Sequence, residues 1–204
     1  MDLATLLARR RMVRSFDATS VDPRWLDDAC ATALWAPTAG NSAGVRMHTI
    51  GADLVTAYFE RATDARWRRE SPRAPGLSRA GAVVLVTSRP QDYLARYAEP
   101  DKASSGLAAR SAWPVPYWHT DAAMATMALL LLLDEAGWSS TLWGNFRHDR
   151  AVLEWIGAPD ESLFASVLIG RPDGQDHRSA SLDRVVPTRD SRVRRLEVSP
   201  ERTP

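Results

Sequence analysis

The chain has 204 residues, of which 45% are hydrophobic and 25% are charged, and its formal net charge is +1. This composition is typical of a globular protein and argues against a disordered chain, and the small net charge argues against a nucleic-acid partner. The length suits one domain that can bury a full hydrophobic core.

Export and membrane signals are not found in the sequence. An acidic residue stands at position 2 and the arginines follow the apolar stretch, which is the reverse of a secretory signal. The longest apolar run, 122–133, has 12 residues, whereas a membrane-spanning helix needs about 20. Cys30 has no second cysteine to pair with, which suits a reducing compartment. We expect a cytoplasmic protein without a membrane partner, in which Cys30 is a buried small hydrophobe.

Helices and strands alternate irregularly along the predicted chain. In order, we expect a helix over 3–9, a helix from 23 to about 36, a strand over 45–50, a helix over 52–69, a strand over 82–88, a helix over 119–136, a strand and turn over 139–146, a helix over 149–156 and a strand over 163–169. This order predicts an α+β fold rather than a regular βαβ series.

Two segments differ from the rest. Residues 89–118 lack periodicity and are rich in aromatics and prolines, and such long loops are usually functional lids or disordered. The helix over 119–136 is apolar on every side in its second half, which predicts burial all round. A subunit interface is one natural place for that helix.

Three motifs could bind a ligand. Four arginines lie within residues 9–14 at a helix end, where they can bind phosphate or simply complement the helix dipole. Residues 36–42 form a turn of small residues that could approach a flat heterocycle, although composition alone favours an ordinary loop. Gly144, between large residues, would let backbone amides face a ligand, or would simply form a tight turn.

In this order and at these distances, the motifs resemble the nitroreductase-like flavoprotein family. That family has a helix, then R-R-S-x-R-x-F, a second helix and A-P-S-x-x-N. The chain has Arg10-Arg11-Met12-Val13-Arg14-Ser15-Phe16 and Ala36-Pro37-Thr38-Ala39-Gly40-Asn41. The resemblance spans about residues 3–186. Met12 replaces the usual serine, and Ala43-Gly44-Val45 replaces the usual Q-P-W, which weakens the inference about ring contacts and substrate.

The resemblance implies a nitroreductase-like fold with a central, mainly antiparallel sheet flanked by helices. It places one FMN-binding domain over 1–186, with 89–118 as an irregular substrate lid and 187–204 as a polar tail. It also implies an intertwined homodimer, with FMN between the subunits and a C-terminal arm that extends to the partner.

The resemblance further implies the residues that bind FMN. Arg10 and Arg14 would bind the phosphate and the ring edge. The remaining contacts would come from Arg11 and Met12, from Pro37, Thr38, Ala39 and Asn41 toward the flavin bound mainly by the other subunit, from Trp143, Gly144 and Asn145 beside the ring, and from Arg178 at the phosphate.

Substrate contacts are expected from Tyr97, Lys102, Tyr117 and Trp118, which would cover the flavin face. A packed surface loop is an almost equal alternative. The implied reaction is ping-pong hydride transfer from NAD(P)H, through the flavin, to a small-molecule electron acceptor such as a nitroaromatic or a quinone. No catalytic side chain is required, since the chemistry takes place on the cofactor.

Different classes of function stay open. The histidines and Cys30 lack metal-ligand spacing, so no metal is expected, and there is no G-x-G-x-x-G or P-loop motif. A flavin enzyme of the same fold could instead act on a specific metabolite, as a dehydrogenase, desaturase or dehalogenase. The sequence is also compatible with a non-catalytic flavin-binding protein and with an interaction protein without flavin.

Overall fold

A four-stranded sheet forms the centre of the protein in the computed structural model, which describes residues 2–145, 147–176 and 179–195. The strand order is β1-β2-β4-β3, and every neighbouring pair is antiparallel. The strands are β1 (Val45–Gly51), β2 (Ala82–Ser88), β3 (Ser139–Trp143) and β4 (Ser162–Gly170). The mainly antiparallel sheet predicted from the sequence is confirmed.

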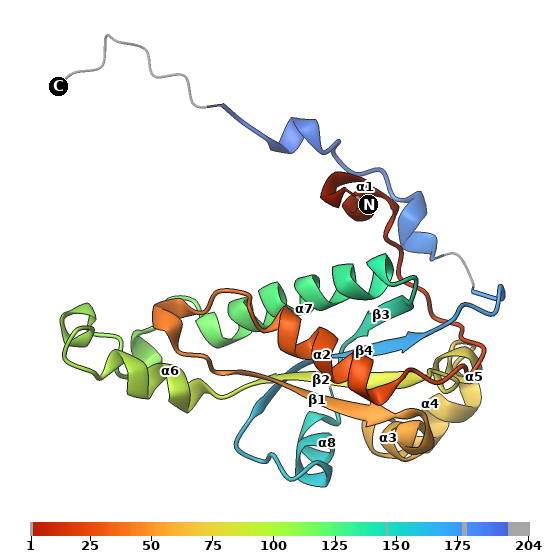
Figure 1. Cartoon of the computed structure of the whole chain (residues 1–204), viewed down its shortest axis with the longest axis horizontal. Coiled ribbons are helices and arrows are strands. Elements are labelled where there is room, and N and C mark those ends of the chain that lie inside the picture. The colour runs from red at the N-terminus through yellow and green to blue at the C-terminus, as the bar shows by residue number, and fades with distance from the viewer. Residues whose placement is uncertain (1, 146, 177–178, 196–204) are drawn as a thin grey trace.

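Helices cover both faces of this sheet (Figure 1). On one face lie α2 (Pro23–Ala33) and α7 (Tyr117–Glu135), and on the other lie α3 (Val55–Ala62) and α8 (Asp149–Trp155). The alternation of side chains along β2 divides the core in two. Val84 and Val86 pack with α2 and α7, whereas Val83 and Leu85 pack with α3 and α8.

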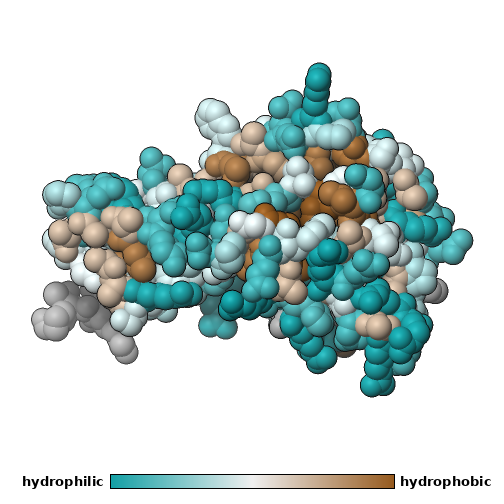
Figure 2. Space-filling view, turned by 90° about the horizontal axis from the view of Figure 1, so that it is seen from below, coloured by the Kyte–Doolittle hydropathy of each residue, from teal (hydrophilic) through white to brown (hydrophobic). Residues whose placement is uncertain are grey.

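Three of the other helices lie around the ends of the sheet, and α1 (Leu3–Arg9) lies beyond it, next to the end of α7 (Figure 1). The three are α4 (Ala65–Glu70), α5 (Ala74–Leu77) and α6 (Pro90–Tyr97). α6 lies at the opposite end of the molecule from α5 (Figure 1). Residues 181–195 are exposed and run past α1, away from the sheet. Seen from the side of α3 and α8, the surface is largely hydrophilic, with hydrophobic surface gathered near its middle (Figure 2).

Some predicted elements were wrong in extent. The helix expected over 52–69 is interrupted because Thr63 is extended (φ −141°, ψ 156°) and the Asp64 side chain caps a new helix, α4. The segment 89–118 is not irregular throughout, since Pro90 at a first helical turn begins α6. α5 was not predicted, and α7 begins at Tyr117 rather than at His119.

The prediction that α7 is buried on every side is also wrong within a single chain. Leu129 and Leu133 are fully buried, whereas Leu131 and Leu132 are only partly buried and Met124 is 42% exposed. A helix that lies on a sheet buries only the side that faces it. The outward side of α7 therefore remains apolar and accessible within the described chain.

Candidate functional site

The arginine motif lies beside the edge strand β3. The backbone N of Val13 donates to the Ser140 carbonyl oxygen at 3.0 Å, and the Met12 sulfur accepts from the backbone N of Leu142 at 3.4 Å. Phe16 is fully buried, and its backbone N donates to the Gly76 carbonyl oxygen at 3.2 Å. These contacts make residues 12–16 an extended segment that places Arg14 next to the end of β3.

Close packing against α5 fixes the position of Arg14. A Cβ atom on Gly76 would lie 2.5 Å from the Ser15 hydroxyl and 2.8 Å from the Arg14 carbonyl oxygen, so only glycine fits there. The Arg14 backbone N donates to the Asp176 carboxylate at 3.1 Å. The guanidinium donates only to the Met12 carbonyl oxygen, at 3.4 Å, and has no ion-pair partner in the described part of the chain. It is therefore available to a ligand.

A cavity of about 390 Å³ opens beside Arg14. Its walls include two arginines and no acidic residue, so a negatively charged or electron-rich group is favoured there. The lining residues are Arg14, Trp67, Ser71, Pro72, Arg73, Leu77, Thr141, Leu142 and Trp143. Sequence reasoning missed Trp67 and Arg73, because a single tryptophan on a polar helix or a single arginine in a turn carries no motif.

Trp67 and Trp143 also line a second cavity, of about 340 Å³, together with Gly144, Asn145 and Arg147. The two indole rings lie 5.6 Å apart between centroids, and both pack on Phe59. This aromatic pair provides flat apolar surface on the wall that the two cavities share. Such surface suits a planar ring system.

The neighbouring arginines of the motif differ in environment. Arg11 is exposed and donates to the carbonyl oxygens of Ala8 and Arg10 at the end of α1, as expected for a cation that complements a helix dipole. Arg10 is different, since its Nη1 atom is buried without a hydrogen-bond partner among the described residues. The residue as a whole is only partly buried, but a buried donor without an acceptor is costly, which favours an anionic ligand at this place.

The Asn145 side chain is buried, although the residue belongs to the lining of the second cavity. Its Oδ1 atom accepts from the Ser166 hydroxyl at 2.6 Å and from the Tyr58 hydroxyl at 3.2 Å, and the residue is 8% exposed. Burial raises the pKa of Tyr58 to about 12, which keeps this donor protonated. The Oδ1 atom is therefore satisfied within the protein, whereas the Nδ2 atom is buried without a partner in the described part of the chain.

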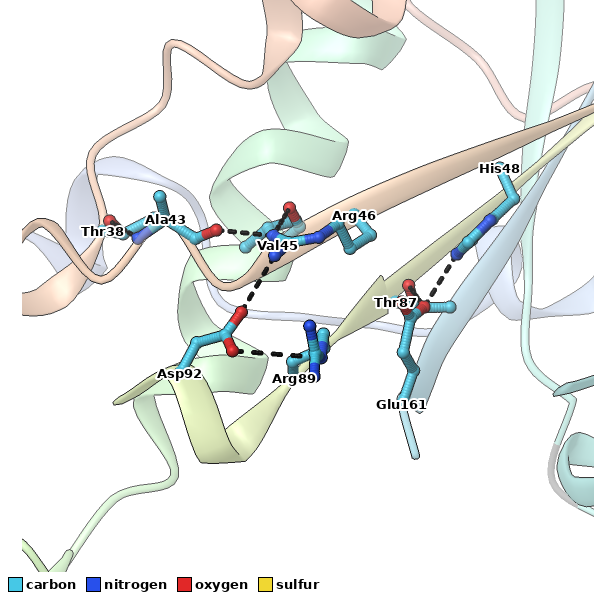
Figure 3. Close-up of polar contacts among 9 residues, drawn as sticks. All are labelled: Thr38, Ala43, Val45, Arg46, His48, Thr87, Arg89, Asp92 and Glu161. Carbon is cyan, nitrogen blue, oxygen red and sulfur yellow. Dashed lines mark hydrogen bonds and ion pairs between the residues drawn. The ribbon is translucent and has the colours of Figure 1, made fainter. Parts of the chain in front are cut away.

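The second motif forms a turn over residues 38–43 that three left-handed residues shape. Gly40, Asn41 and Ala43 have φ values of 61°, 56° and 48°. The Ala43 backbone N donates to the Thr38 hydroxyl at 3.0 Å (Figure 3). Position 40 needs glycine because its φ is positive and because a Cβ atom there would lie 2.7 Å from the Tyr97 ring.

Polar side chains from other elements hold the turn. The backbone N of Ala39 donates to the Asp121 carboxylate at 2.8 Å, and the Arg96 guanidinium donates to the Gly40 carbonyl oxygen at 2.9 Å. Arg46 donates to the Ala43 carbonyl oxygen at 2.6 Å and pairs with Asp92 of α6 at 2.9 Å (Figure 3). Asp121, Arg96 and Arg46 are thus functional candidates that the motif analysis missed.

The two motifs do not meet within one chain. Met12 forms a bridge with Ser140, and the strand pairing places Ser140 in line with Gly51 of β1. The turn over 38–43 leads instead into Val45, six residues away at the other end of β1. At about 3.3 Å per residue, the motifs are separated by about 20 Å along the sheet.

The residues expected to contact substrate gather around α6 and the start of α7. Trp118 is only 3% exposed and packs against Trp113, so its ring is not open to a substrate in the described chain. Tyr97 lies edge-on to Trp113 at 4.7 Å, and the Lys102 ammonium lies 5.8 Å from the Tyr97 ring centre. Tyr117, at 43% exposed, is the most accessible of the four.

Cys30 is buried, as the sequence predicts, and burial raises the pKa of its thiol to about 12, so the thiol is a poor nucleophile. Arg178 lies outside the described residues. Within residues 2–145, 147–176 and 179–195, no cluster of histidine, cysteine and acidic residues could hold a metal ion. No described helix is long and apolar enough to cross a membrane.

Several solved structures share this fold. A nitroreductase from Lactococcus lactis, CinD, solved in complex with nicotinic acid, is 17% identical with a TM-score of 0.67, over 92% of this chain and 100% of that one. An enone reductase of gut-bacterial fatty acid saturation, CLA-ER, is 17% identical with a TM-score of 0.67, over 92% of this chain and 98% of that one. An oxidoreductase containing FMN is 19% identical with a TM-score of 0.63, over 84% of this chain and 78% of that one.

At the level of sequence, a search of curated proteins finds no significant match. The model of the nitroreductase family, however, matches residues 7–171, which include both motifs and all four strands. This match and the shared fold are consistent with the geometry of the cavity. The chain belongs to the nitroreductase family.

Proposed function

We propose that the protein is an FMN-dependent oxidoreductase that uses NAD(P)H to reduce small acceptors such as nitroaromatics or quinones. Family membership supports the oxidoreductase class, and the structural relative that contains FMN supports the cofactor. The proposal includes a homodimer, with one flavin held at each of two equivalent sites between the subunits.

One observation carries the cofactor assignment, namely the cationic cavity beside the arginine motif. Arg14 and Arg73 line it and no acidic residue does, and the Nη1 atom of Arg10, from the same motif, is buried with no partner in the described chain. FMN offers a phosphate for a guanidinium and a flat ring for the Trp67 and Trp143 wall. The residues present therefore fit the cofactor.

The homodimer is proposed because the site is incomplete in one chain. The turn over 38–43 lies about 20 Å from the arginine motif along the sheet, too far to complete the same pocket wall. Tyr117 and Met124 are exposed on α7 at a spacing of seven residues, with the partly buried Leu131 following on the same side. An apolar stripe of this kind fits a second copy of the chain.

Bound FMN would supply the two-electron redox chemistry, which no described side chain can perform. The chain's own contribution is electrostatic and steric. The guanidinium groups of Arg14 and Arg73 would stabilise negative charge on an electron-rich ring, and Trp67 and Trp143 would exclude water from one side of it.

An FMN titration with matched variants tests the cofactor assignment. Arg14→Ala should raise the Kd for FMN about tenfold or more, because a charge-assisted contact is lost. Arg150→Ala, at an 88% exposed side chain on α8, should leave the Kd unchanged. Equal Kd values for the wild type and Arg14→Ala would contradict the assignment.

Rapid mixing tests the electron donor. NADH or NADPH should bleach the flavin absorbance of the oxidised protein, and a quinone should then restore it. Failure of both nicotinamides to reduce the flavin would overturn the proposed donor and favour the oxidation of a specific metabolite.

A further inference from the structure

We propose that Asp121 is a positioning residue that fixes the turn over 38–43 for the flavin site of a second copy of the chain. This inference rests on the proposed function. It goes further because it assigns a role to a buried carboxylate that belongs to neither motif and lines neither cavity beside Trp67.

Asp121 lies in the second turn of α7 and is 1% exposed. Its Oδ2 atom accepts two hydrogen bonds, from the Ala39 backbone N at 2.8 Å and from the Tyr93 hydroxyl at 2.9 Å. Its Oδ1 atom accepts from the Thr120 hydroxyl at 3.3 Å. No cation pairs with it in the described chain, so its bonds are directed at the turn and at the helix α6 that covers the turn.

Tyr93 strengthens the hold of Asp121 on this region, because its hydroxyl group stays protonated and keeps donating to the carboxylate. The side chain is fully buried, and burial, together with the hydrogen bond to Asp121, raises its pKa above the usual range for tyrosine. The hydroxyl therefore stays protonated and donates to the carboxylate. A Cβ atom on Gly44 would lie 2.4 Å from the Tyr93 ring, so the same tyrosine also packs against the end of the turn.

The turn needs such support because its backbone is strained. Asn41 and Ala43 both have positive φ values; asparagine tolerates this conformation, but alanine adopts it only at a cost that the surroundings must offset. The enforcing contacts come from the Asp121 carboxylate on one side and from Arg96, at the Gly40 carbonyl oxygen, on the other. These specific contacts to a strained backbone indicate that the surface of the turn over 38–43 has to keep one conformation.

The shaped surface faces away from its own chain. Asn41 is exposed, and Trp35, just before the turn, is 89% exposed. On α7, Tyr117 lies one turn before Asp121 and Met124 about one turn after it, both more than 40% exposed. A second copy of the chain fits this apolar surface, because the cationic cavity of the same chain lies about 20 Å away along the sheet, beyond the reach of the turn.

Variants of Asp121 distinguish a role in positioning the turn over 38–43 from a general role in folding. Asp121→Ala should raise the Kd for FMN about tenfold, since it leaves the Ala39 amide without its acceptor. Asp121→Asn should recover most of the affinity, because the carboxamide oxygen can still accept the two bonds from the Ala39 backbone N and the Tyr93 hydroxyl. The matched control is Thr126→Val, which removes another buried hydrogen bond of α7, to the Ala122 carbonyl oxygen, and should leave the Kd unchanged.

Mixed dimers test the action on the partner. Protomers that carry Arg14→Ala and protomers that carry Asp121→Ala are combined, and FMN bound per dimer is measured. If Asp121 acts on the other copy, one site of each mixed dimer contains no defect, and one FMN should bind with the wild-type Kd. If it acts within its own chain, both sites contain one defect, and no recovery in the mixed dimers would overturn the proposal.

Two further results would also overturn it. The first is an Asp121→Ala homodimer that binds FMN like the wild type. The second is a wild-type protein that binds no FMN, which identifies the failure as that of the proposed function. Should Asp121→Ala not fold, Arg96→Ala takes its place, since it removes the contact to Gly40 from a partly exposed position.

Discussion

Replacement of Arg10 by methionine should have opposite effects on the stability of the cofactor-free protein and on its affinity for FMN. Methionine keeps most of the apolar stem of arginine and removes the guanidinium, whose Nη1 atom is buried without a partner in the described chain. An unsatisfied buried donor costs about 1–3 kcal/mol, and more when it is charged. Without FMN, Arg10→Met should therefore raise the free energy of unfolding by about 1–3 kcal/mol.

Affinity should change in the other direction. A hydrogen bond between a guanidinium and a phosphate contributes about 1.5–3 kcal/mol, and each 1.4 kcal/mol is a factor of ten in Kd. Arg10→Met should thus weaken FMN binding about 10- to 150-fold. Urea unfolding of the cofactor-free protein and fluorescence titration with FMN measure the two effects separately.

Arg150→Met is the matched control, because the Arg150 side chain is 88% exposed and lies on α8, outside the motif. It should change the Kd for FMN by less than about threefold and stability by less than about 0.5 kcal/mol. The reasoning would be refuted if Arg10→Met destabilised the cofactor-free protein while the Kd for FMN stayed at the wild-type value. That result would mean that Arg10 has a structural partner rather than a ligand.

Three further predictions concern other parts of the molecule. Gly40→Ala should destabilise the fold by about 1–2 kcal/mol in thermal unfolding, because alanine disfavours its φ of 61° and would press on the Tyr97 ring; unchanged stability would contradict the described turn. Cys30, with its pKa raised to about 12, should be alkylated at pH 8 only after unfolding, and its rate should still be rising with pH above pH 10; rapid labelling of the native protein would contradict its burial. Trp67→Ala joins two cavities, so it should raise kcat/KM for bulky acceptors relative to small ones; an unchanged ratio would show that this wall does not select substrates.

Local sequence patterns predicted the sheet and most helices well. The run over 82–88 predicts a strand because it is short, β-branched and bounded by polar residues, and all seven residues of β2 are buried. Asp22 followed by Pro23 predicted the start of α2, where the Asp22 side chain accepts from the Trp25 backbone N at 2.8 Å. Each of these signals comes from residues that are close in sequence.

Contacts between distant residues could not be predicted in the same way. Asp121 reaches Ala39 across 82 residues, and no local pattern distinguishes it from any polar residue near a helix start. Trp67 and Trp143 line one cavity although they come from different elements. Trp118 was expected to face substrate, but its ring packs under the segment 89–118, because α6 gives that segment a small core of its own.

The visible spectrum of the purified protein, with the released cofactor identified, tests the central claim most directly. We predict a flavin spectrum, FMN as the only cofactor released on denaturation, and one FMN for each chain after reconstitution. A colourless protein that gains no absorbance when FMN is added would contradict the account.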